Sequence, residues 1–137
     1  MTAGQRKSLQ SRKPTRGVQI KAQLRLLLDG EIALGPGKVE LLAAIDATGS
    51  ISAAGKQLGM SYRRAWLLVD TMNRCFREPL VTTAKGGAAG GGTALSASGR
   101  AVLQHYRELE RRLGKITDLA AAELAPLLRR KPLQPPG

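Results

Sequence analysis

The sequence predicts an α+β fold that is mostly helical, with an N-terminal β-hairpin and a long C-terminal helix. Three observations indicate it. Apolar and polar residues alternate strictly over 18–28, as in a half-buried strand. Apolar residues then recur at helical spacing over 36–76. A glycine-rich segment at 85–92 precedes a last, longer helical pattern.

Length and composition bound the organisation of the chain. A chain of 137 residues predicts one domain with tails. Hydrophobic residues make up 42% and aromatic residues only 3%, so a modest core must be built from Leu, Ile, Val and Ala. We expect a disordered basic arm over 1–17, a folded domain over 18–128 and a tail over 129–137.

The chain is strongly basic, with a formal net charge of +12. Such a balance favours polyanionic partners, nucleic acid before anionic membranes. No segment approaches the roughly 20 apolar residues of a membrane span, and no apolar run follows the basic N-terminus as in a signal peptide. We therefore expect a cytoplasmic protein without membrane contact.

Cys75 and His105 are the only cysteine and the only histidine. An intrachain disulfide is therefore impossible, and a zinc site or any other metal or cofactor is not expected. We expect Cys75 to be a buried thiol, with a redox switch as the weaker alternative.

A β-hairpin and a helix are expected at the start of the folded domain. The strand over 18–28 is followed by Asp29-Gly30, a strong hairpin signal, and a short return strand at 31–34. Pro36 lies at the first turn of the next helix, which Thr48-Gly49 ends.

Residues 49–76 predict two helices joined by a tight turn at Gly59. Ser52 and Ser61 can cap them. Ala54 and Gly55 are small enough for the helices to cross closely, and Leu58 and Met60 point inward at the turn. One face of the second helix is apolar: Tyr62, Ala65, Leu68, Val69, Met72 and Phe76.

The opposite face of the second helix carries Arg63, Arg64, Asp70, Thr71 and Arg74. A capped helix, apolar behind and basic on its outer first turn, has the character of a helix that enters the major groove of double-stranded DNA. An ordinary helical hairpin in a core is the alternative.

A second hairpin is expected at 81–95, with a glycine-rich tip. Directly after a recognition helix, such a hairpin is the wing of a winged helix-turn-helix. No Gly-Lys-Ser/Thr follows the glycines, so a nucleotide-binding loop is excluded; a plain flexible turn stays possible.

Ser96 should cap a long helix that Pro126 limits to about residue 125. Its apolar seam is too long for a small domain to cover, although the first half should pack on the domain's own core. We therefore expect a homodimer formed by this helix and the strand. The predicted interface comprises Leu24, Leu26, Val102, Tyr106, Leu109, Leu113, Ile116, Ala120 and Leu124.

Segment 49–66, GSISAAGKQLGMSYRRAW, together with Met72-Asn73 and the glycines of 86–92, resembles the N-terminal winged helix of the ModE family of bacterial molybdate-responsive repressors, which is related to that of LysR-type regulators. The resemblance covers about 34–113. It implies DNA binding at Ser61, Tyr62, Arg63, Arg64 and the wing, and homodimerisation. The family's C-terminal oxyanion-binding domains have no counterpart in the sequence, so we expect a single-domain member, with no effector identified.

These observations predict a sequence-specific DNA-binding transcription regulator. A less specific nucleoid protein and an adaptor that docks a separate sensor are the alternatives. No paired carboxylates or nucleophile–base pair suggests an enzyme. The predicted DNA-binding residues are Ser50, Ser52, Ser61, Tyr62, Arg63, Arg64, Thr71, Arg74, Lys85, Gly86 and Gly87.

Overall fold

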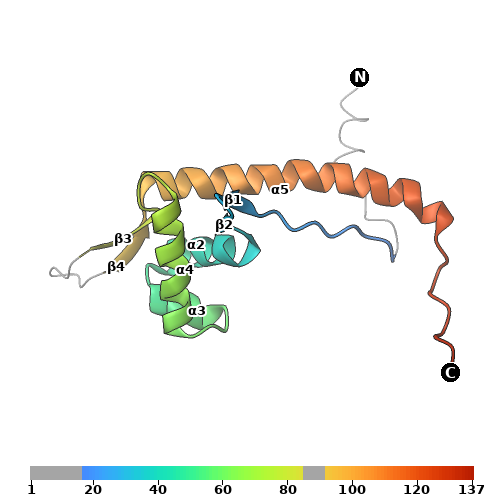
Figure 1. Cartoon of the computed structure of the whole chain (residues 1–137), viewed down its shortest axis with the longest axis horizontal. Coiled ribbons are helices and arrows are strands. Elements are labelled where there is room, and N and C mark those ends of the chain that lie inside the picture. The colour runs from blue at the N-terminus through green and yellow to red at the C-terminus, as the bar shows by residue number, and fades with distance from the viewer. Residues whose placement is uncertain (1–16, 85–91) are drawn as a thin grey trace, which may run out of the picture. The chain divides into compact units, whose positions relative to one another are not determined.

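The computed structural model describes residues 17–84 and 92–137 (Figure 1). The chain divides into two compact units. One is Gln23–Glu110, and the other combines the described residues before it with Arg111–Gly137. The predicted basic arm lies outside the described residues except for Gly17.

The first hairpin pairs β1 (Leu26–Leu28) with β2 (Glu31–Leu34) in antiparallel register. Asp29 and Gly30 both have positive φ, 49° and 84°, which is the backbone of a two-residue primed turn. The predicted strand over 18–28 is wrong for 18–25. The four residues of β2 can pair only with the end of that segment, and alternation without a pairing partner does not make a strand.

Helix α2 (Pro36–Thr48) begins and ends where the sequence indicates. Pro36 lies in its first turn, and Gly49 ends the helix in the left-handed region, with φ at 70°. The helix buries Val39, Leu41, Leu42, Ala44 and Ile45, and so provides much of the core.

Helices α3 (Ile51–Gln57) and α4 (Tyr62–Cys75) form the predicted pair. Gly59 takes φ of 70° in the turn. A Cβ on Gly55 would lie 3.2 Å from the Cβ of Ala65, which confirms that the helices cross closely there. Met60 and Leu58 are partly buried against the core.

The caps of this pair confirm one prediction and correct another. Ser61 caps α4, its Oγ accepting a hydrogen bond from the backbone N–H of Arg64 at 3.1 Å. The cap of α3 is Ser50, whose Oγ accepts from the N–H of Ala53 at 3.0 Å, and not Ser52. Ser50 has the extended backbone that a cap requires, whereas Ser52 already lies inside the helix.

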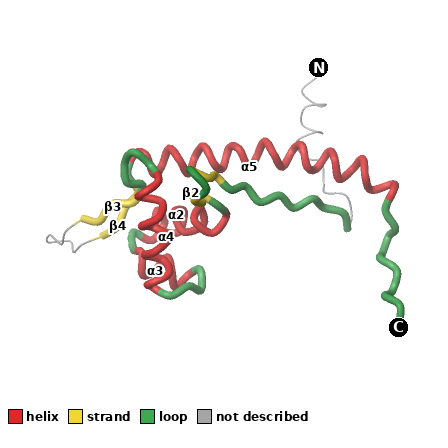
Figure 2. Tube along the Cα trace, viewed as in Figure 1, coloured by secondary structure: helices red, strands yellow, loops and turns green. Residues whose placement is uncertain are grey.

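The wing consists of β3 (Val81–Ala84) and β4 (Gly92–Leu95), paired from Val81 with Leu95 to Ala84 with Gly92. Figure 2 shows the two strands projecting beside the helices. Its base is tied to the helical part, because the N–H of Thr93 donates to the carbonyl of Gly49 at 2.9 Å.

Helix α5 (Ala97–Leu124) starts at Ser96, whose Oγ accepts from the N–H of Gly99 at 3.0 Å, and gives way to a 3₁₀ turn, η1 (Ala125–Leu127), at Pro126. Tyr106 is buried, and Val102 and Leu103 pack against the core cluster. The first half of α5 therefore packs on the domain, as expected.

Candidate DNA-binding surface

Helix α4 presents two different faces. Ala65, Val69 and Met72 are buried against α2 and α3, while Arg63 and Arg64 are exposed in the first turn. Within the described residues, neither guanidinium group has a carboxylate partner. The first turn of α4 thus carries two cations available to an outside anion.

Tyr62 does not belong to the buried face, and its predicted place there is wrong. The side chain is 56% exposed, because the first residue of α4 lies beyond the edge of the core. The indole Nε1 of Trp66 donates a hydrogen bond to the Tyr62 hydroxyl, and the two rings meet edge to face with centroids 6.4 Å apart.

Two residues of this surface were missed by the sequence analysis. Trp66 is 39% exposed and Leu67 is 56% exposed. The signal was present in the spacing: Trp66 follows Tyr62 by four residues, and Leu67 follows Arg63 by four, so each shares a face with its partner. Apolar side chains therefore stand beside the cations.

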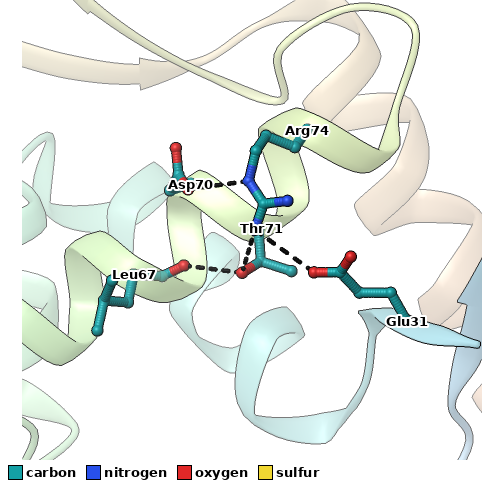
Figure 3. Close-up of polar contacts among 5 residues, drawn as sticks. All are labelled: Glu31, Leu67, Asp70, Thr71 and Arg74. Atoms are coloured by element: carbon teal, nitrogen blue, oxygen red, sulfur yellow. Dashed lines mark hydrogen bonds and ion pairs between the residues drawn. The ribbon is translucent and has the colours of Figure 1, made fainter.

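Arg74 is a predicted site residue with three side-chain partners. Its Nε donates to Asp70 Oδ2 at 3.0 Å, and its Nη2 lies 3.4 Å from Glu31 Oε1 and from Thr71 Oγ1 (Figure 3). The hydrogen bond to Asp70 and the charge of Glu31 raise the pKa of Arg74 above its ordinary value. Thr71 in turn donates its hydroxyl hydrogen to the carbonyl of Leu67 at 3.0 Å.

Two of the three predicted site serines accept hydrogen bonds that cap helices. Ser50 and Ser61 accept cap hydrogen bonds, and Ser52 is exposed on α3. A hydroxyl that accepts from a backbone N–H keeps its own hydrogen for a further acceptor, such as a phosphate oxygen.

Asn73 connects α4 to the wing. Its Oδ1 accepts from the N–H groups of Leu80 and Val81 at 2.8 and 3.2 Å, and its Nδ2 donates to the Val81 carbonyl at 3.1 Å. These three hydrogen bonds attach the start of the wing to the last turn of α4. The predicted wing residues Lys85, Gly86 and Gly87 lie outside the described residues.

The predicted dimer residues within Gln23–Glu110 surround an apolar groove. Leu26 and Leu109 are about half exposed, whereas Tyr106 is buried and donates its hydroxyl hydrogen to the Leu24 carbonyl at 2.7 Å. Burial, with a smaller contribution from Glu110, raises the pKa of Tyr106. The groove has a volume of about 270 Å³ and is lined by Leu24, Arg25, Leu26, Leu34, Phe76, Val102, His105, Tyr106 and Leu109.

The predicted dimer residues of the second unit lie on the later part of α5. Ile116 is 63% exposed and Leu124 is 48% exposed, while Leu113 and Ala120 are half-buried.

Cys75 is half-buried rather than fully buried, because it lies at the margin of the α4 core face.

Within 17–84 and 92–137, no helix combines the length and the apolar character that crossing a bilayer requires.

These elements, a helix pair followed by a two-stranded wing, make a winged helix-turn-helix. The crystal structure of the CbnR DBD–DNA complex has the same fold: it superposes with a TM-score of 0.51 and 21% identity, over 64% of this chain and 94% of that one. No protein-family model matches the chain.

Three curated relatives are similar in sequence. The molybdenum-pterin-binding protein MopB of Rhodobacter capsulatus is 45% identical over 83 residues, which are 61% of this chain and 31% of MopB. The molybdenum transport protein ModE of Azotobacter vinelandii is 44% identical over 88 residues, 63% of this chain and 33% of that protein. The DNA-binding transcriptional dual regulator ModE of Escherichia coli K12 is 36% identical over 89 residues, 65% and 34% of the two chains. The chain spans about a third of the length of the curated relatives it matches.

Proposed function

We propose that the protein is a sequence-specific transcription regulator that binds double-stranded DNA as a homodimer in the cytoplasm. The observation that carries this proposal is the first turn of α4, where Arg63 and Arg64 are exposed in front of a buried apolar face. The winged helix-turn-helix fold and the similarity to the ModE transcriptional regulators support it.

The chemistry of the exposed face fits the major groove. Arginine can donate two hydrogen bonds to the O6 and N7 of guanine, which discriminates bases, or bind a phosphate, which does not. We assign one of Arg63 and Arg64 to a base and the other to phosphate. Ser50, Ser52, Ser61, Tyr62, Thr71 and Arg74 are assigned to the surrounding phosphates, with Lys85, Gly86 and Gly87 on the wing.

A homodimer accounts for the apolar surface that the single chain leaves exposed. Strand β1 has no neighbour on its outer side within the described residues, and Leu26, Leu27 and Leu28 are 49–54% exposed. An exposed apolar edge strand invites pairing. A second copy, contacting this edge, the adjacent groove and the seam of α5, would cover these side chains.

Selection of bound fragments from a random-sequence DNA pool tests the proposal. We expect enrichment of one sequence with two-fold symmetry, its half-sites about one helical turn apart or a multiple of it, because a symmetric dimer presents two α4 helices. Enrichment of a single, non-repeated half-site would contradict the homodimer. Binding without enrichment would instead favour a nucleoid protein, in keeping with the net charge of +12.

A further inference from the structure

Arg74 lies on the outer face of α4 but differs from the other arginines of that helix. Its guanidinium group is held from two sides, by Asp70 one turn earlier on α4 and by Glu31 on β2 (Figure 3). Arg63 and Arg64 have no such carboxylates within the described residues. Two negative charges therefore face one positive charge at this point of the surface.

The three side chains are open to solvent. The exposed fractions are 56% for Arg74, 48% for Glu31 and 58% for Asp70. Exposed ion pairs are weak and exchange readily, so a phosphate oxygen arriving from solvent can replace either carboxylate. A guanidinium group accommodates phosphate and carboxylate in the same planar geometry, which makes the two acceptors direct competitors.

The position of Arg74 makes such competition relevant to DNA. Arg63, Asp70 and Arg74 follow one another at intervals of seven and four residues, so they lie along one side of the helix. If the base edges of a duplex contact the first turn of α4, the sugar-phosphate backbone of that duplex therefore lies near Asp70 and Arg74.

We propose that Glu31 and Asp70 are intramolecular competitors of DNA phosphate, which keep Arg74 from contributing fully to DNA binding. The inference rests on the proposed function and adds to it a restraint on affinity. Because a phosphate contact carries no base information, the restraint lowers the affinity for specific and random duplexes by a similar factor.

The test measures binding of the full chain to a fluorescent double-stranded oligonucleotide of random sequence, by anisotropy at several salt concentrations. Glu31→Gln keeps the size of the side chain and removes its charge. We expect it to tighten binding about two- to fivefold, the range set by the coupling of exposed charge pairs. The slope of log affinity against log salt should steepen by up to about 0.9, the equivalent of one phosphate contact. Asp70→Asn should act in the same direction.

The matched control is Glu40→Gln, which removes an exposed charge from α2. It reports the effect of net charge alone, and we expect a smaller gain. In an Arg74→Ala background, Glu31→Gln should lose its advantage over Glu40→Gln, because the residue that it releases is missing. Unchanged thermal unfolding of each variant shows that the fold is intact.

Two outcomes would overturn the inference while leaving the proposed function intact. One is equal affinity for the Glu31→Gln and Glu40→Gln proteins. The other is a gain from Glu31→Gln that persists in full without Arg74. A wild-type protein that does not bind DNA at all would contradict the proposed function itself.

Discussion

The side-chain oxygen of Asn73 accepts a hydrogen bond from the backbone N–H of Leu80 at 2.8 Å, and so joins α4 to the wing. The same oxygen also accepts from Val81, and the amide nitrogen donates back to the Val81 carbonyl. One side chain thus satisfies three backbone groups where the chain leaves α4 and enters β3. Asn73 therefore links the two elements that are proposed to contact DNA.

Replacing Asn73 should therefore weaken the fold. Asn73→Ala leaves part-buried backbone groups without partners, which we expect to lower the free energy of unfolding by about 1–3 kcal/mol in urea denaturation. Asn73→Asp keeps an oxygen that can accept from both N–H groups and loses the Nδ2 donor, so its loss of stability should be smaller. If the alanine and aspartate variants are equally stable, the bonds to the Leu80 and Val81 N–H groups do not contribute as described.

Two glycines of α5 should respond in opposite ways to alanine. A Cβ on Gly99 would lie 2.1 Å from the carbonyl oxygen of Leu80, whereas a Cβ on Gly114 would meet nothing within 4 Å. Gly99→Ala must displace backbone at the start of the wing and should cost at least about 1–3 kcal/mol of stability. Gly114→Ala should raise the helix propensity and stabilise by roughly 0.5–1 kcal/mol. Thermal unfolding of the two variants checks both signs.

Tyr106 provides a pH-dependent contribution to stability. Burial raises the pKa of its phenol, so the folded protein holds the proton more tightly than the unfolded chain. The stability that depends on the neutral phenol is complete below the ordinary value of about 10 and is lost as pH rises through the raised pKa. Tyr106→Phe also removes the hydrogen bond to the Leu24 carbonyl, at a cost of about 1 kcal/mol at neutral pH.

We therefore expect the stability difference between wild type and Tyr106→Phe to be constant from pH 7 to about 9 and to shrink above about 10. Urea denaturation at each pH measures it. A difference that grows with pH would show that the phenol is not the neutral donor in the folded state.

The proposed dimer can be tested on the exposed seam of α5. Ile116→Asp places a charge on a side chain that is 63% exposed in the single chain, so the monomer should fold normally. In a dimer it buries that charge without a partner, and we expect association to weaken by roughly 3–5 kcal/mol in sedimentation equilibrium. Lys115→Asp, one residue off the seam, is the control. Equal weakening by both variants, or a monomeric wild type at tens of micromolar, would contradict this interface.

Local signals predicted much of this fold. The turns, caps and helix ends occur at residues that the sequence analysis named for them: Asp29-Gly30, Pro36, Gly49, Gly59, Ser61, Ser96 and Pro126. Each of these depends on backbone geometry within a few residues, which the sequence encodes directly. The predicted apolar face of α4 was confirmed at Ala65, Val69 and Met72, which are buried, and was wrong at Tyr62.

The remaining features depend on contacts between distant segments. Residues 18–25 alternate like a strand but pair with no strand in the part of the chain that the structure describes. Tyr62 follows the helical period of the core face but lies past the core's edge. The contact of Arg74 with Glu31 spans 43 positions, and no periodicity reports which carboxylate a distant arginine will meet.

Sequence reading by the first turn of α4 is tested most directly by comparing the affinities of Arg63→Ala and Arg64→Ala for the selected site and for random duplex at one salt concentration. We predict that the variant lacking the base reader loses about 1–3 kcal/mol on the selected site and much less on random DNA. The other variant should weaken both about equally. Arg129→Ala, which removes the same charge from the C-terminal tail, is the control. If Arg63→Ala and Arg64→Ala each lose equal affinity for both duplexes, and no more than Arg129→Ala does, the first turn of α4 does not read DNA sequence.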